Sequence, residues 1–129
     1  MIALDTSSLV AYFAGLGGED TEATRLALEY KQAVLPPVVL AELFSDPKLP
    51  ESIAAALKRI PMLAVTEGYW ERAGRLRARV IWRGLKARLA DSLIAQSCLD
   101  SDVGLITRDA DFRHFARSAG LKLFPSDVH

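Results

Sequence analysis

Short apolar runs alternate with longer stretches of helical periodicity along the chain, and this alternation restricts the possible folds more than any other feature. Five runs have the length and composition of buried strands, at residues 2–4, 33–35, 62–65, 103–107 and 121–124. Strands that alternate with helices are typical of an α/β domain with three layers around a mostly parallel sheet. The 129 residues suffice for a single domain with one core, which we expect to span residues 1–129.

The segments between these runs predict helices, and several of them carry recognisable start and stop residues. The sequence GLGG at residues 15–18 ends the first helix, and the residues Pro36 and Pro37 start the third. We expect a first helix that Ser7 or Ser8 caps and that ends at Phe13, and further helices over 19–32, 38–44, 51–59, 67–82, 89–99 and 111–119.

The composition indicates a soluble protein of a reducing compartment. A single cysteine, Cys98, cannot form an internal disulfide. No apolar run approaches the roughly 20 residues that a membrane-spanning helix needs. The N-terminus has no basic stretch, and Asp5 interrupts what would be the apolar core of a signal peptide. We therefore expect a cytoplasmic protein that has no contact with a membrane.

The charges are distributed unevenly, although the formal net charge is zero. Residues 58–88 carry nine Lys and Arg against two acids, whereas acids outnumber bases on both sides of this segment. Such a basic middle can bind a polyanion on one face, or it can simply be the solvated face of a helix. The candidate RNA-binding residues recur along one side of the long helix and continue beyond it: Arg72, Arg75, Arg79, Arg83, Lys86 and Arg88.

Carboxylates occupy positions where an α/β sheet normally places its ligands. Asp5 ends the first strand, Asp109 and Asp111 follow the fourth, and Asp91 lies in the first turn of an apolar helix, where the helix dipole should keep it ionised. Glu42 lies in the apolar stretch VVLAELF, either at a surface or buried with a partner. In open α/β sheets, ligands bind beyond the carboxyl ends of the strands, near the point where the strand order reverses.

Each of these acids taken alone has a purely structural explanation, as a helix cap, a first-turn acid or a loop acid. Together they form a set of oxygen ligands without a nearby His or Cys partner. Carboxylates that crowd together raise one another's pKa values, and a divalent cation relieves the repulsion. Oxygen-only ligands favour Mg²⁺ or Mn²⁺ over Zn²⁺.

Four stretches in this order resemble those of the PIN-domain nucleases, and in particular those of the VapC-type toxins of bacterial and archaeal toxin–antitoxin pairs: MIALDTSSLV, VVLAELF, LADSLIAQ and LITRDADF. The resemblance covers essentially the whole chain. It implies a three-layer α/β/α PIN-like domain with a five-stranded parallel sheet in the order 3-2-1-4-5. The strand order then reverses between strands one and four, which places Asp5 and Asp109 side by side.

The resemblance also implies a set of site residues. Asp5, Glu42, Asp91 and Asp109 match the family's acidic quartet and are the candidate catalytic residues. The candidate metal ligands are Asp5, Asp91, Asp109 and Asp111, of which Asp111 matches an acid that only some members use. Thr107 matches the hydroxyl residue of a T-x-D/N pattern and is either a supporting site residue or an ordinary β-branched strand end.

The function that the resemblance implies is metal-dependent hydrolysis of RNA phosphodiester bonds, with Mg²⁺ or Mn²⁺ as cofactor, by the toxin component of a type II toxin–antitoxin pair. The implied partners are an RNA substrate, a cognate antitoxin protein and a second copy of the chain. One core cannot bury all of Trp70, Ile81 and Trp82, so we expect one of these tryptophans at an interface. We expect His114 and His129 at the surface. The alternative is a non-catalytic PIN-like module that binds RNA or protein. GLGG lacks the GK[ST] of a phosphate loop, and no GxSxG occurs.

Overall fold

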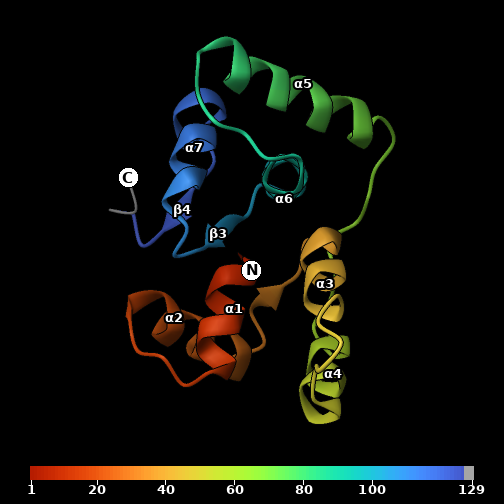
Figure 1. The fold of residues 1–129 in the computed structure, drawn as a ribbon, viewed down its shortest axis with the longest axis vertical. Helices are drawn as coiled ribbons and strands as arrows, with labels where there is room; N and C mark the ends of the chain where they lie inside the picture. The colour runs from red at the N-terminus through yellow and green to blue at the C-terminus, as the bar shows by residue number, and fades with distance from the viewer. Residues whose placement is uncertain (127–129) are drawn as a thin grey trace.

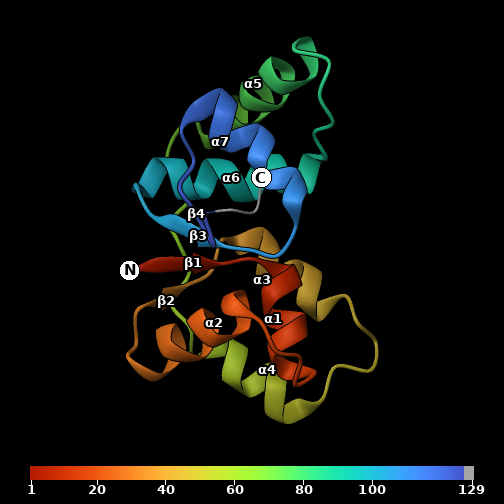
Figure 2. The same cartoon turned by 90° about the vertical axis from the view of Figure 1, so that its left-hand side faces the viewer.

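A parallel β-sheet lies at the centre of the computed structural model, which describes residues 1–126 (Figures 1 and 2). Within these residues the sheet has four strands in the order β2-β1-β3-β4. The strands are β1 (Ile2–Leu4), β2 (Ala33–Val34), β3 (Gly104–Ile106) and β4 (Leu123–Phe124). The most central strand, β1, pairs with β2 on one side and with β3 on the other, so the strand order reverses between β1 and β3.

The helices form the layers on either side of this sheet, as Figure 2 shows. Helices α5, α6 and α7 lie on one side, and α1, α2 and α4 lie on the other. Helix α3 contacts both α1 and α6. The helices are α1 (Thr6–Phe13), α2 (Glu19–Glu29), α3 (Pro37–Phe44), α4 (Glu51–Lys58), α5 (Tyr69–Trp82), α6 (Leu89–Ser101) and α7 (Arg113–Ala119).

The predicted third strand, at residues 62–65, is the main departure from the expected sheet. It is reduced to one isolated parallel bridge between Leu35 and Met62. The Leu35 N–H donates to the Pro61 carbonyl at 2.9 Å, and the Leu63 N–H donates to the Leu35 carbonyl at 2.8 Å. Pairing stops there because the next two residues of the neighbouring chain segment are prolines without an N–H, and α3 begins at the second of them. The expectation of five strands was therefore wrong, although the segment lies beside β2 as predicted.

Local backbone conformation explains where the helix boundaries differ from the predicted ones. The helix expected over 67–82 begins only at Tyr69, because Gly68 adopts a left-handed conformation with φ +80°. The helix expected over 19–32 ends at Glu29. The helix expected over 111–119 is divided into a 3₁₀ turn, η1 (Ala110–Phe112), and α7.

Packing of α5 against α6 fixes the layer that carries Asp91. Helix α5 buries one apolar side, and its Tyr69 hydroxyl donates to the Leu93 carbonyl of α6 at 2.6 Å. On the outer side of α5, Trp70 and Trp82 are 65% and 90% exposed. Among residues 1–126, the helices are all too short or too polar to cross a membrane.

Candidate active site

Four segments that are far apart in the sequence converge at one edge of the sheet. Asp5 directly follows β1 and precedes α1, while Asp109 follows β3 and precedes η1. The two strands are adjacent and parallel, so their carboxyl ends meet at the same edge, and the Asp5 N–H donates to the Ile106 carbonyl at 2.9 Å. Glu42 reaches this edge from α3, and Asp91 reaches it from the first turn of α6.

Asp5 is buried, with an exposed fraction of 3%, and hydroxyl groups surround its carboxylate. Its Oδ2 atom accepts hydrogen bonds from Ser7 Oγ at 2.6 Å and from Thr107 Oγ1 at 2.8 Å. Burial raises the pKa of the Asp5 carboxyl, and the hydrogen bonds from Ser7 and Thr107 oppose this rise. The side chain is therefore held in one orientation by two hydroxyl groups from opposite ends of the chain.

Thr107 connects the two carboxylates that follow the strands. Its side chain is fully buried, and its Oγ1 atom donates to Asp5 and accepts the Asp109 N–H at 3.0 Å. The acids Asp5, Glu42, Asp91 and Asp109 are called the acidic cluster below. The Thr107 hydroxyl thus has hydrogen-bond partners in two residues of this cluster.

Burial and neighbouring negative charges act on Asp91 as well. Its pKa is raised to about 7, first by desolvation and then by the negative charges of Asp109 and Asp5, with a smaller contribution from Glu42. The Arg88 guanidinium opposes this rise in the pKa. The helix dipole does not hold the pKa of Asp91 at its ordinary value, because a dipole contributes only about 0.3–1 kcal/mol and burial next to like charges outweighs it.

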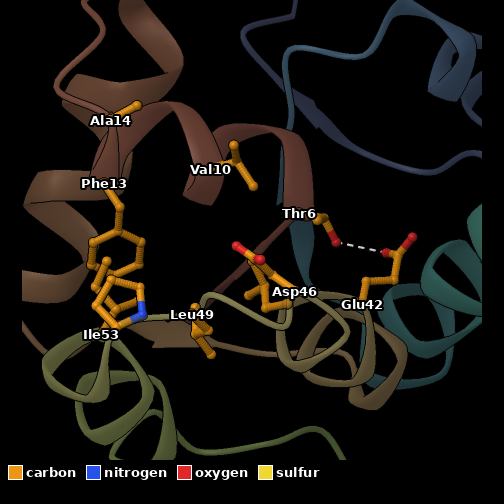
Figure 3. Close-up of a pocket in the computed structure, with 10 residues that line it drawn as sticks. Thr6, Val10, Phe13, Ala14, Glu42, Asp46, Leu49 and Ile53 are labelled. Atoms are coloured by element: carbon orange, nitrogen blue, oxygen red, sulfur yellow. Dashed lines mark hydrogen bonds between the residues drawn. The ribbon is translucent and has the colours of Figure 1, made fainter.

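Glu42 is solvent-exposed, because the apolar stretch around it buries only Val39 and Leu43. The Thr6 hydroxyl donates to Glu42 Oε1 at 2.6 Å and so connects α3 to the first turn of α1. This pair lies at one end of a mostly apolar groove of about 280 Å³, shown in Figure 3. The groove is lined by Thr6, Val10, Phe13, Ala14, Glu42, Leu43, Asp46, Leu49, Pro50 and Ile53.

Asp111 lies at the margin of the cluster. Its backbone N–H donates to Asp109 Oδ1 at 2.9 Å, and its carboxylate lies 3.8 Å from Lys86 Nζ. His114 is buried rather than at the surface as expected, and its Nδ1 atom lies 2.9 Å from the Lys86 carbonyl oxygen. His129 lies outside the described residues.

The six cations of the predicted basic stripe differ in their partners. Arg72 donates to both carboxylate oxygens of Asp100, at 3.1 and 2.7 Å, and Asp100 lies roughly 13 Å along α6 from Asp91. Arg79 and Arg83 point to Ser118 of α7, at 3.4 and 3.1 Å. Arg75 lies 3.8 Å from Glu71 on its own helix. Among the six predicted cations, Lys86 and Arg88 are the ones that interact with carboxylates of the cluster.

Comparisons with known proteins identify the family of the chain. A sequence model of the family described as PIN domain matches residues 2–118. This chain belongs to the PIN domain family. A crystal structure of VapBC2 from Rickettsia felis, bound to a DNA fragment from its promoter, contains a similar fold, with a TM-score of 0.73 and 24% sequence identity over 95% of this chain and 97% of that one. No curated protein matches the chain.

The donor chemistry of this PIN domain fits a divalent cation that prefers oxygen ligands. The cluster offers carboxylates and hydroxyl groups, and the mutual repulsion on Asp91 is the kind that a cation relieves. Within residues 1–126, no three side chains of His, Cys, Asp or Glu lie close enough together to hold an ion as they stand. The fit therefore rests on the chemistry of the donors and on their convergence.

Two residues that contact the acids of this PIN domain were not predicted as site residues. Ser7 donates to Asp5 and accepts the Arg108 N–H, and Thr6 donates to Glu42. Ser7 was expected only as a possible cap of the first helix, and Thr6 was given no role. Their signal in the sequence is the run DTSS, which places hydroxyl groups directly after a carboxylate in the first turn of a helix.

Proposed function

We propose that this PIN domain is a metal-dependent endoribonuclease that hydrolyses RNA phosphodiester bonds, and that it is the toxin of a type II toxin–antitoxin pair. One observation carries the proposal: the carboxylates of Asp5, Glu42 and Asp109, from three separate segments, all raise the pKa of Asp91. A fold gains nothing in stability from such mutual repulsion. A site for a divalent cation needs several carboxylates close together, and the cation offsets their repulsion.

Asp5, Asp91 and Asp109 are the residues that would hold Mg²⁺ or Mn²⁺, with Asp111 at the margin. When bound, the cation supplies positive charge that stabilises the phosphoryl oxygens and lowers the pKa of a bound water. Ser7 and Thr107 orient the Asp5 carboxylate for this task. Glu42 is exposed and is held through Oε1 by Thr6, so its Oε2 atom is available to accept a proton from the attacking water.

Lys86 and Arg88 are the cations that we assign to the RNA backbone beside the scissile bond. Both side chains belong to exposed residues in the loop that leads into α6 and Asp91. Arg79 and Arg83 extend this basic surface along the α5–α7 contact. Arg72 serves instead to attach α5 to the end of α6.

We assign the groove in Figure 3 to the antitoxin. Its walls are mostly apolar, and the carboxylates of Glu42 and Asp46 belong to its lining. This combination suits an apolar peptide segment that carries a basic side chain next to the acidic cluster. The similarity to a VapBC2 structure supports a partner of this kind through the shared fold.

We assign the outer face of α5 to a second copy of the chain. Trp82, Ile81 and Leu89 line one groove there and are 90%, 47% and 57% exposed, respectively. Large exposed apolar side chains in one patch are typical of interfaces. Light scattering of the purified chain should give the mass of a dimer, and a monomer mass that is unchanged up to about 100 μM would contradict this assignment.

The experiment that tests the proposed function is cleavage of a mixed RNA pool by the purified full chain. We expect cleavage with Mg²⁺ or Mn²⁺, no cleavage with a chelator, and a loss of at least roughly 100-fold in the Asp91→Asn variant. Asp102→Asn is the matched control, because it makes the same acid-to-amide change at an exposed residue whose ion-pair partner is Lys122.

Folded protein that is free of antitoxin and binds Mn²⁺ without cleaving the pool would contradict the enzymatic proposal. It would favour a PIN-like module that binds RNA or protein without hydrolysing it. Full activity of Asp91→Asn with metal present would contradict the assignment of the site.

A further inference from the structure

Arg108 stands in the sequence between Thr107 and Asp109, yet its side chain turns away from the acidic cluster. Its Nε atom donates to Asp20 Oδ2 at 2.8 Å, its Nη2 atom donates to Asp20 Oδ1 at 2.9 Å, and Nη2 also lies 3.2 Å from the Gly17 carbonyl. A guanidinium that is held by both oxygens of one carboxylate is fixed in direction as well as in place. Arg108 is therefore not available as a free cation for RNA.

Asp20 is a rigid partner for this arginine. It lies in the first turn of α2 with an exposed fraction of 5%, and its Oδ2 atom also accepts a hydrogen bond from Ser8 Oγ at 2.9 Å. The hydrogen bonds from Arg108 hold the pKa of the Asp20 carboxyl below its usual value. Asp20 therefore stays ionised at neutral pH, and the ion pair joins α1, α2 and the segment after β3.

The loop before α2 is shaped around this ion pair. Gly18 has φ +143°, and a Cβ atom at this position would lie 2.7 Å from Asp20 Oδ1 and 3.2 Å from Arg108 Nη2. A side chain at residue 18 would displace the charged groups and also require an unfavourable backbone conformation. The GLGG sequence thus permits the close approach of Asp20 and Arg108.

The backbone of Arg108 is connected directly to the acidic cluster. Its N–H donates to Ser7 Oγ at 3.3 Å, and Ser7 in turn donates to Asp5. On either side of it, Thr107 donates to Asp5, and Asp109 donates its N–H to Thr107. A shift of this backbone would therefore disturb the two carboxylates that follow β1 and β3 at the same time.

We propose that Arg108 is a positioning residue of the acidic cluster, because its ion pair with Asp20 fixes the backbone of residues 107–109. This backbone keeps the hydrogen bond from Thr107 to Asp5 and keeps Asp109 near Asp91. This inference rests on the proposed function, because it gives the cluster a metal-binding task. Loss of a residue that hydrogen-bonds to a metal ligand commonly reduces the metal affinity or the activity 10–100-fold.

The test compares Arg108→Gln, Asp20→Asn and the double variant with the wild type, as full-length chains. The matched control is Arg25→Gln, which breaks an exposed ion pair with Glu22 on the same helix α2. The measurements are the dissociation constant for Mn²⁺, from the electron paramagnetic resonance of free Mn²⁺, and the kcat for RNA cleavage at saturating Mn²⁺. Unfolding by urea reports the stability of each variant separately.

We expect Mn²⁺ to bind roughly tenfold or more weakly to both single variants, equally weakly to the double variant, and normally to Arg25→Gln. A merely structural ion pair would lower the stability and leave the Mn²⁺ affinity of the folded protein unchanged. A dissociation constant for Mn²⁺ and a kcat within about twofold of the wild-type values would overturn the inference.

If the single variants do not fold, Arg108→Lys takes their place, since it keeps the charge and loses the two-oxygen contact. An intermediate loss of Mn²⁺ affinity supports the inference, and an unchanged affinity overturns it. Wild-type protein that neither binds Mn²⁺ nor cleaves RNA overturns the proposed function and this inference together. Active wild-type protein with unaffected Arg108 variants overturns the inference alone.

Discussion

Asp91→Asn should make the metal-free protein more stable at pH 8, although it removes a proposed metal ligand. The native pKa of Asp91 is about 7, compared with an ordinary value of 3.8. Between roughly pH 4 and pH 7 the native state holds a proton that the unfolded state has released. The contribution of Asp91 to the free energy of unfolding therefore falls as the pH rises through this range. Above pH 7 the carboxylate is charged in both states, and the cost of holding that charge in the native state lowers the free energy of unfolding by its full amount.

The size of this penalty follows from the difference between the two pKa values. At about 1.36 kcal/mol per pH unit the difference corresponds to roughly 4 kcal/mol, and partial solvent access of the side chain reduces this to about 2–4 kcal/mol. The substitution also removes a first-turn acid, which costs about 0.3–1 kcal/mol. The penalty from burial and repulsion together is the larger effect, so we expect a net gain of roughly 1–3 kcal/mol at pH 8 and almost none at pH 4.

Urea unfolding with a chelator present, at pH 4 and at pH 8, measures this gain. Asp102→Asn is again the control for the chemical change. Adding Mn²⁺ at pH 8 should stabilise the wild type more than Asp91→Asn, because a bound ligand stabilises only the state that binds it. If Asp91→Asn is no more stable than the wild type at pH 8, or gains equally at both pH values, the pKa of Asp91 is not raised in the native state.

Three further predictions concern the neighbours of the cluster. Thr107→Val keeps the shape but loses the hydrogen bond to Asp5, so it should lower the free energy of unfolding by roughly 1.5–3 kcal/mol in urea and reduce cleavage, whereas Thr107→Ser should restore both; a variant as stable and active as the wild type would contradict this role. Arg88→Gln should weaken RNA binding and reduce its salt dependence by about one counterion, while Arg72→Gln should not. Equal losses of RNA affinity in a filter-binding titration would show that Arg72 also binds RNA. Val10→Arg should leave toxicity intact but prevent the cognate antitoxin from relieving growth arrest, and normal relief in a co-expression assay would exclude the groove as the antitoxin site.

The local sequence was sufficient to predict the type of fold and to single out acids at strand ends and at the start of a helix. Apolar runs of three to five residues between periodic helical segments predicted a parallel sheet with helices on both faces, and α5 buries the side that its periodicity predicts. Parallel strands bring their carboxyl ends to one edge, and the strand order that the resemblance to the PIN-domain nucleases implied placed Asp5 and Asp109 side by side. The helices and strands follow from periodicity, which is a property of short segments, whereas the strand order came from the resemblance.

Tertiary structure alone decided what depends on partners from distant segments. Whether residues 62–65 form a strand was decided by two prolines in the neighbouring segment. The pKa of Asp91 was decided by burial and by carboxylates from three other segments, and these effects outweigh the dipole of α6, the helix that carries Asp91. Arg72 and Arg108 look alike in the sequence as free cations, but each is paired with an acid 28 or 88 residues away. Pairing and desolvation depend on distances in space, and a sequence determines these only after the whole chain has folded.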